Sequence, residues 1–361
     1  MPGILGIRRR RARARPRPKE RGKSFAVTFF AVVVLAAFLS PLVRSATLSI
    51  KTPEQVAAVD SGILPVSPLT FTYQDRDYPI FNVPLPDGTT KQLALIRKGL
   101  KQSQFADPFD PNAQSAPLIK WDGNWRELQA VTVLDPHFEN FTNVWNEINY
   151  PRLLLNTILI ALLSMIGTIV SCTLVAYGFA RFRFPGRNAL FILVIATIFL
   201  PGAVTIIPTY TLFLKIGWVG TWLPLIVPAF FANAYDVFLL RQYFLTIPRD
   251  MDEAAAIDGA GPFRTLISVI LPQAWPAIIA VSIFTFVYSW NDFFGPLIYL
   301  SGSPDLQTIA VGLAVFSGAR VAQDPGLIQA ANLMTLVIPV GIFLVFQRFF
   351  VRGIVITGVE K

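Results

Sequence analysis

The sequence predicts an all-α polytopic membrane protein with six transmembrane helices and a small, mostly β extracytoplasmic domain after the first helix. Two observations lead to this fold class. Of the 361 residues, 53% are hydrophobic and only 15% are charged, which is too apolar for an ordinary soluble domain. The chain also contains separate windows of about 20 apolar residues, the length that a helix needs to cross a bilayer. One long segment of different composition interrupts them.

Uninterrupted apolarity defines the spans, because backbone polar groups in lipid have to be bonded within their own helix. The third span contains Pro201 and Pro208, which we expect to break it. The predicted spans are Ser24–Val43, Leu153–Ala180, Ala189–Thr209, Trp222–Phe244, Trp275–Leu300 and Ala330–Phe350.

The formal net charge of +9 comes entirely from the N-terminal tail. Residues 1–23 hold ten Lys and Arg against Glu20, whereas the remaining 338 residues hold 21 charges of each sign. A basic run can bind nucleic acid, but before an apolar span it is more typical of a cytoplasmic anchor. We therefore expect no nucleic-acid partner. The 20-residue span that follows the tail is also longer than the core of a cleaved secretory signal.

Basic residues in the short loops set the orientation, because such residues stay on the cytoplasmic side. The short loops assigned to the outside hold only Lys215 and Arg320. We expect a multi-pass protein of the cell (inner or plasma) membrane with both termini cytoplasmic. The segments assigned to the inside carry most of the Lys and Arg: residues 1–23, Arg181–Arg187, Arg241–Pro272 and the C-terminal tail 353–361.

The segment between the first two spans, residues 44–150, is rich in Pro, Asp and aromatic side chains. Strand-like runs at Tyr78–Val83 and Gln92–Ile96 flank Pro86-Asp87-Gly88, and Asp-Gly between apolar runs is typical of a hairpin. A second turn is expected at Trp121–Trp125. These signals predict a mostly β outer domain, whose role remains open between a docking platform and a stiff spacer.

The polar loop between the fourth and fifth spans carries the strongest functional signal. Pro248-Arg249-Asp250 favours the first turn of a helix, and Gly259 suits the left-handed residue that ends it. A second helix should start at Pro262, run towards the membrane and end at Pro272. The loop is then a helix–turn–helix lever between two spans.

Small side chains make the surface of this lever flat, so that a partner can approach closely. The residues concerned are Ala254, Ala255 and Ala260. An ordinary Ala-rich connecting helix is the alternative interpretation. The combination of Glu-Ala-Ala, Asp-Gly-Ala and a later Leu-Pro is more specific than an Ala run, and it favours a docking loop.

This loop and the surrounding spans resemble the MalG-type permease subunits of carbohydrate ABC importers. The resemblance covers about Phe138–Lys361, so that 151–352 corresponds to the permease transmembrane domain and 248–272 to its EAA coupling loop. Residues 44–137 depart from the family, and no role is carried over to them. The segments that carry the resemblance, besides the loop, are Asn156-Thr157, Ala176–Phe182, Phe184–Arg187, Pro208–Tyr210, Leu239–Phe244, Trp290–Phe293 and Gln347–Gly353.

The resemblance implies a transport subunit that performs no bond chemistry. Its expected partners are ABC ATPase subunits, a second, MalF-like permease, an extracytoplasmic solute-binding protein, the lipid bilayer and a sugar substrate. ATP binding would close the ATPase dimer and move the loop, which switches the pathway between inward- and outward-facing states. The ATPase-coupling residues implied in this way are Glu253, Ala254, Ala255, Asp258 and Gly259.

Polar groups within the apolar spans are the second set of candidates, because such groups usually face an interior or an aqueous cavity. Sugars need hydrogen-bonding partners and flat apolar surfaces, a mixture that the fifth span offers. Helix–helix contact is the alternative, and Asp236 is expected to pair with Arg241. The candidate substrate-pathway residues are Tyr210, Trp290, Asn291 and Asp292.

Other classes of function find little support. A single cysteine, Cys172, and a single histidine, His137, allow neither an internal disulfide nor a Cys/His metal cluster. We expect no metal and no cofactor. No Walker motif occurs, so ATP hydrolysis belongs to a partner. Two alternatives stay open, namely a permease for another solute class and a membrane scaffold or sensor with an outer receptor domain.

Overall fold

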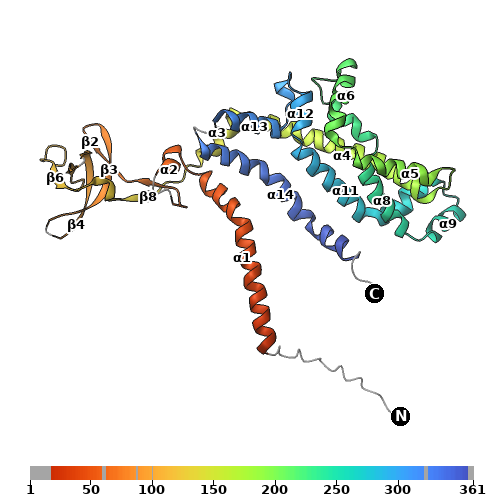
Figure 1. The fold of residues 1–361 in the computed structure, drawn as a ribbon, viewed down its shortest axis with the longest axis horizontal. Coiled ribbons are helices and arrows are strands. Elements are labelled where there is room, and N and C mark those ends of the chain that lie inside the picture. Colours follow the sequence, from red (N-terminus) through yellow and green to blue (C-terminus); the bar gives the residue numbers. More distant parts are fainter. Residues whose placement is uncertain (1–17, 59–61, 87, 100, 321–323, 357–361) are drawn as a thin grey trace, which may run out of the picture.

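The computed structural model describes residues 18–58, 62–86, 88–99, 101–320 and 324–356. Within these residues the chain is mostly helical, and a separate β region projects from one end of the helices (Figure 1). The predictions for the basic tail at residues 1–17 and for residues 357–361 lie outside the described part of the chain.

Five helical stretches are long and apolar enough to cross a membrane, by length and composition, among the residues described. They are built on α1 (Pro18–Leu48), α4 (Tyr150–Arg181), α8 (Ala234–Thr246), α11 (Leu271–Asn291) and α14 (Pro325–Ile356). The apolar stretches themselves run over Phe25–Leu48, Tyr150–Arg181, Leu223–Thr246, Pro262–Asn291 and Pro325–Gln347.

A bent pair of helices occupies the position of the third predicted span. The pair, α5 (Arg187–Ala196) and α6 (Gly202–Lys215), is bent by 99°, and it makes a sixth span only if the two helices are counted together. The break falls at Pro201, as predicted. Pro208 lies inside α6 without a break, so that part of the prediction was wrong. Membrane helices tolerate an interior proline where neighbouring groups satisfy the backbone carbonyl that it frees.

The fourth span begins with a short helix, α7 (Leu223–Ile226), and a 3-10 turn at Val227–Phe230. The ring of Phe230 lies directly against Gly167 of α4, where an added Cβ would come within 2.7 Å of the ring. Glycine at this position therefore allows the close approach of the two segments.

A continuous helix runs from Pro262 to Asn291 and comprises α10 (Pro262–Thr265), a π-helical turn at Leu266–Ile270 and α11. Pro272 was expected to end a helix, but it lies in the first turn of α11. The π turn adds one residue to the turn before Pro272. The missing N–H and the bulky ring of Pro272 are thereby accommodated without a break.

The predicted fifth span extended to Leu300, whereas α11 ends at Asn291 and a short helix, α12 (Phe294–Tyr299), follows. A further helix, α13 (Ile309–Arg320), lies in the segment predicted as an outer loop.

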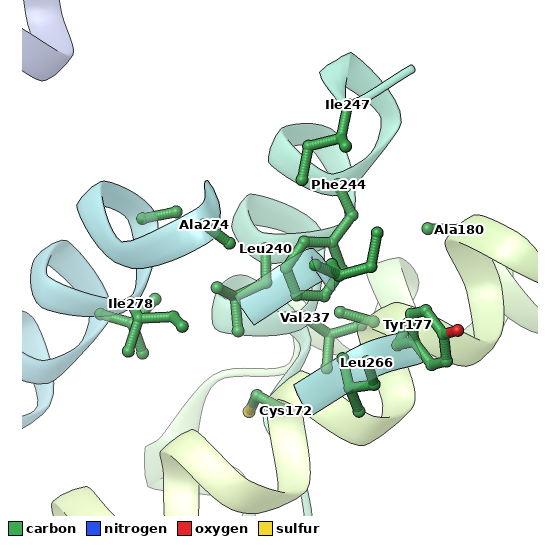
Figure 2. Packing of buried hydrophobic residues seen from close by; sticks show 14 residues of the cluster. Cys172, Tyr177, Ala180, Val237, Leu240, Phe244, Ile247, Leu266, Ala274 and Ile278 are labelled. Atoms are coloured by element: carbon green, nitrogen blue, oxygen red, sulfur yellow. The ribbon is translucent and has the colours of Figure 1, made fainter. Parts of the chain in front are cut away.

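Two buried clusters hold the helices together. In the first, α4 packs against α8 and the α10–α11 helix, and Figure 2 shows Cys172 and Tyr177 facing Val237, Leu240 and Leu266. Small residues such as Ala176 and Ala180 let the backbones approach closely. The second cluster joins α4 to α3 (Glu139–Glu147), α11, α13 and α14. The central helix of the bundle is therefore α4.

The β region confirms the predicted mostly β character of the segment after the first helix. A six-stranded sheet has the order β2-β3-β4-β5-β6, with β7 paired to β3, and β1 and β8 form a separate two-stranded ribbon. The strands are β1 (Val66–Pro68), β2 (Thr70–Tyr73), β3 (Arg76–Pro84), β4 (Thr90–Arg97), β5 (Gln102–Ala106), β6 (Ile119–Asp122), β7 (Gln129–Ala130) and β8 (Thr132–Leu134).

The predicted hairpin is confirmed, since β3 pairs with β4 in antiparallel register from Ile80↔Ala94 to Pro84↔Thr90. Gly88 has a φ of +80° and Gly123, in the second predicted turn, a φ of +154°. The sheet has its own core of buried apolar side chains: Phe81, Val83, Leu93, Leu95 and Phe105. We call the described residues of 69–130 the β arm.

The ends of the outer segment belong to the helical part. Helix α1 continues to Leu48, beyond the predicted end at Val43. The short helix α2 (Pro53–Ala57) and helix α3 both pack against α14. We call the described residues of 49–68 and 131–149, which include the β1–β8 ribbon, the root of the β arm.

Candidate functional site

The helical hairpin between α8 and α11 consists of α9 (Asp250–Ile257), a turn and α10. Acidic side chains occupy the first turn of α9, where they compensate the positive end of the helix dipole. Gly259 has a φ of +77°, as predicted. The Gly259 N–H donates to the Ala256 carbonyl at 3.0 Å and the Ala260 N–H to the Ala255 carbonyl at 2.9 Å. This bond pair is the Schellman arrangement that ends a helix.

Most of the predicted coupling residues lie on the open surface of the hairpin. Glu253, Ala254, Asp258 and Gly259 are exposed. Ala255 is only 8% exposed, and it borders the space between α9 and the α10–α11 helix. The structure adds one residue that the sequence analysis missed, because Ile257 is 87% exposed at the end of α9. In the sequence, a single large apolar residue directly after the run Ala254–Ala256 could have indicated this exposed position.

The hairpin is tied to the end of α4. Arg181 Nε lies 3.3 Å from an Asp252 carboxylate oxygen, and Arg181 Nη2 donates to the Ile247 carbonyl at 3.0 Å. The Tyr177 hydroxyl donates to the Pro262 carbonyl at 3.1 Å. These contacts join both limbs of the hairpin to the central helix. The sequence placed Arg181 in a basic cytoplasmic segment and in one of the segments that carry the resemblance; its position directly after an apolar span was the signal for a structural role.

Two hollows flank α9. One has a volume of about 500 Å³ and lies between α9 and the α10–α11 helix; the other, of about 320 Å³, lies between α9 and the end of α4. A partner that docks here would meet both charged and apolar side chains. The first is lined by Asp250, Met251, Ala254, Asp258, Arg264 and Val269, among others, and the second by Tyr177, Arg181, Arg249, Asp252, Glu253 and Pro262, among others.

The candidate pathway residues lie in two environments. Trp290 is 3% exposed and stacks on Phe286 at 5.8 Å between ring centroids, so it packs helices together and offers no open surface. Asn291 is exposed and donates to the Val287 carbonyl at 2.8 Å. An Asp292 carboxylate oxygen accepts the Gly295 N–H at 3.1 Å. The structure thus separates Trp290 from its two neighbours.

Tyr210 of α6 is half-buried and stacks on Tyr299 of α12 at 6.2 Å between ring centroids. The α6 and α12 helices therefore meet through an aromatic pair. The pair leaves Tyr210 partly open, in contrast to Trp290.

One face of α11 holds further open side chains that the sequence analysis did not single out. Tyr288 is 77% exposed and Phe284 43% exposed. With Asn291 they follow the i, i+4, i+7 spacing of a single helix face. That spacing was the signal that could have found them. The face combines two aromatic rings with an amide.

Asp236 does not pair with Arg241, contrary to expectation. It accepts a hydrogen bond from Asn233 Nδ2 at 2.6 Å, and its N–H donates to Asn233 Oδ1 at 2.9 Å. The guanidinium of Arg241 lies over the Phe191 ring at 4.0 Å. The physical reason is helix capping, because Asn233 satisfies the first turn of α8 where the span is interrupted.

Several apolar helices around a central helix, with an exposed small-residue hairpin anchored on it, are the features expected of a membrane transport subunit. The chain belongs to the family of binding-protein-dependent transport system inner membrane components, which it matches over residues 165–355. It is accordingly a permease subunit of an ABC importer. The match begins within α4 and includes the whole hairpin.

Curated relatives extend the comparison. The chain is 32% identical over 258 residues to the osmoprotective compounds uptake permease protein GgtD of Synechocystis sp., which covers 71% of this chain and 85% of the relative. It is 36% identical over 211 residues to the sn-glycerol-3-phosphate transport system permease protein UgpE of Rhizobium meliloti, with 58% of this chain and 74% of the relative covered.

A solved structure shares the fold. A chain of a bacterial ABC transporter involved in the import of the acidic polysaccharide alginate aligns with a TM-score of 0.64 and 18% identity, covering 93% of this chain and 99% of that chain. At this identity the likeness concerns the fold alone.

Proposed function

We propose that this chain imports a sugar or oligosaccharide as one of two permease subunits, driven by a separate ATPase that binds the α9–α10 hairpin. The observation that carries the proposal is the hairpin itself. Its partner-facing side is open at Glu253, Ala254 and Asp258, while its inner side is fastened to α4 through Arg181 and Tyr177. An ATPase that moves α9 would therefore move the helix at the centre of the bundle.

The coupling is a shift between two states of the permease. An ATPase dimer that binds one state more tightly raises its population. Glu253, Ala254 and Asp258 are proposed to contact the ATPase, and Gly259 to hold the turn that positions them. Ala255 acts from inside by packing α9 against the bundle.

A sugar substrate is supported by the open face of α11. Two relatives take up osmoprotective compounds and sn-glycerol-3-phosphate according to their names. The α11 face offers aromatic rings and an amide at Phe284, Tyr288 and Asn291, which suit a polyhydroxylated solute with apolar faces. Tyr210 and Asp292 are kept as further pathway candidates. A permease for another solute class remains the alternative.

The remaining proposals concern the assembly. The bent α5–α6 pair is counted as one span, which makes six spans with both termini in the cytoplasm and the β arm outside. A second, MalF-like permease would complete the pathway, and an extracytoplasmic solute-binding protein would deliver the substrate. The positive-inside pattern of the loops supports this orientation.

Co-expression with the neighbouring ATPase and permease genes tests the proposal. The wild-type chain should co-purify with the ATPase and support ATP-dependent uptake of a sugar from a radiolabelled panel. A Glu253→Lys, Gly259→Trp double variant should insert into the membrane but lose the ATPase or its coupling. A wild-type chain that is folded in the membrane and retains no ATPase would overturn the proposal. Uptake of amino acids or phosphate, but no sugar, would select the alternative substrate class.

A further inference from the structure

Large apolar side chains of the outer segment are exposed mainly at the root of the β arm. Among the described residues of the arm itself, Phe109 is the one large apolar side chain on the open surface, at 72% exposure. The arm thus has the surface of a water-soluble domain. The root differs, with large apolar side chains 43% to 72% exposed at Ile63, Leu64, Val133, Leu134, Phe138 and Trp145.

The ribbon at the centre of the root has little support from the protein on its apolar side. Strand β1 pairs with β8 through Val66↔Leu134 and Ser67↔Val133, and successive side chains of a strand point to opposite faces. A two-stranded ribbon alone is marginal in water. The polar contacts lie on one side, where the Ser67 hydroxyl donates to Asp135 at 2.7 Å and Gln55 Nε2 donates to Ser67 at 2.8 Å. Leu134 is 67% exposed.

The root is fastened to the ends of membrane helices. Helix α1 ends at Leu48, and two residues later the Ile50 carbonyl accepts the His137 N–H at 2.9 Å. The Asn140 side chain donates to the Ser49 carbonyl at 2.9 Å and to the Lys51 carbonyl at 3.0 Å. These bonds place Phe138, one residue after His137, beside the end of an apolar span.

The starts of two other spans meet the same region. Trp145 stacks on Tyr150, the first residue of α4, at 5.6 Å between ring centroids. Gly326, in the first turn of α14, lies so close to the root that an added Cβ would come within 2.2 Å of the Lys51 carbonyl oxygen. Trp and Tyr at the ends of spans are typical of the membrane–water interface. The apolar surface of the root therefore continues that of the membrane helices.

We propose that the root of the β arm is seated in the membrane interface, with Ile63, Leu64, Leu134 and Phe138 among lipid headgroups and the first acyl carbons. The bilayer is the partner of this surface, because the exposed apolar side chains border the span ends and are nearly absent from the rest of the arm. The seat fixes the inclination of the arm to the membrane. It depends only on the helices being membrane spans and not on the substrate or on the side of the membrane.

Site-directed spin labelling of the full-length chain, in the complex in which it purifies and reconstituted in lipid nanodiscs, tests this seat. Cys172 is buried, so the unsubstituted chain serves as the background for labelling. Labels are placed at Leu134→Cys and Ile63→Cys in the root. Controls are Leu35→Cys, on the lipid-exposed length of α1, and Gln92→Cys, on the exposed surface of the arm. Power saturation measures collisions with oxygen and with a water-soluble nickel chelate.

The root labels should collide with oxygen more, and with the nickel chelate several-fold less, than the label at position 92. Their values should fall between those at positions 92 and 35. Nickel accessibility equal to that at position 92 would show that the root stands in water and would overturn the proposal. Low accessibility to both reagents together with an immobilised spectrum would show that a protein subunit covers the root, which also overturns it. Two independent root positions guard against a local effect of one label.

Discussion

Arg181, the last residue of α4, contacts Asp252 of α9 through an ion pair of 3.3 Å that is largely shielded from water, because the two side chains are 7% and 24% exposed. The same guanidinium donates to the Ile247 carbonyl, just before the hairpin, at 3.0 Å. The central helix and the hairpin are thus joined by a charge pair that water reaches only in part. Breaking a shielded pair by removing one partner is strongly destabilising.

Reversal of one charge in this pair should uncouple transport. We expect Arg181→Glu to lower uptake at least tenfold in proteoliposomes while the ATPase remains bound, because two carboxylates would then face each other at the junction. The double variant Arg181→Glu, Asp252→Arg should recover part of the uptake. Uptake per ATP hydrolysed is the quantity to measure. A double variant as inactive as the single one would contradict a role for the pair.

Gly259→Ala should weaken coupling, whereas Gly261→Ala should not. The φ of Gly259 is +77°, and a left-handed conformation costs a residue with a Cβ roughly 1–2 kcal/mol. Gly261 has a φ of −71° and open space around it, so it is a matched control in the same turn. The measurement is ATPase retention on affinity purification together with uptake. Equal effects of the two substitutions would argue against the turn geometry.

Trp290→Ala and Tyr288→Ala should separate packing from transport. Trp290 is 3% exposed, and truncation of a buried Phe or Trp costs about 3–5 kcal/mol; we expect a lower melting temperature and less protein in the membrane. Tyr288 is 77% exposed, so its removal should leave stability nearly unchanged and raise the substrate concentration for half-maximal uptake. Thermal melts and uptake curves of both variants distinguish a loss of stability from a loss of substrate affinity. Unchanged uptake with Tyr288→Ala would remove this face from the pathway.

The root of the β arm should loosen in acid. Hydrogen bonds from Ser67 and then from His137 hold the pKa of Asp135 below its ordinary value. A carboxyl whose pKa is lowered by folding contributes stability above its unfolded pKa of about 3.9 and loses it as the pH falls through the lower folded pKa. The protection of the β1 and β8 amides, measured relative to their intrinsic exchange rate at each pH, should therefore decrease below about pH 4. Ser67→Ala should reduce the size of this loss, because the folded pKa of Asp135 then lies closer to its unfolded value; an unchanged loss would contradict this origin.

The predicted elements came mainly from length, composition and turn residues. Apolar windows predicted five stretches that the structure contains, and Pro201 predicted the site of the bend between α5 and α6. The alternation and Asp-Gly signal predicted the β3–β4 hairpin. At the hairpin between α8 and α11, Gly259 was predicted from its conformational freedom alone. Pro208 and Pro272 were misjudged because a proline inside a packed helix need not break it: Pro208 lies within a continuous α6, and a π turn before α11 accommodates Pro272.

The sequence by itself predicted which segments are long and apolar enough to cross a membrane, that the segment after the first of them contains a β sheet, and the helix–turn–helix form of the loop before α11. Only the tertiary structure decided which side chains face inward, separating Ala255 from Ala254 and Trp290 from Tyr288. A helix in lipid is apolar on every side, so hydrophobic periodicity does not mark its buried face. Small residues and the neighbouring helices set that face. The Arg181–Asp252 contact depends on such packing, because it joins residues that are distant in the chain.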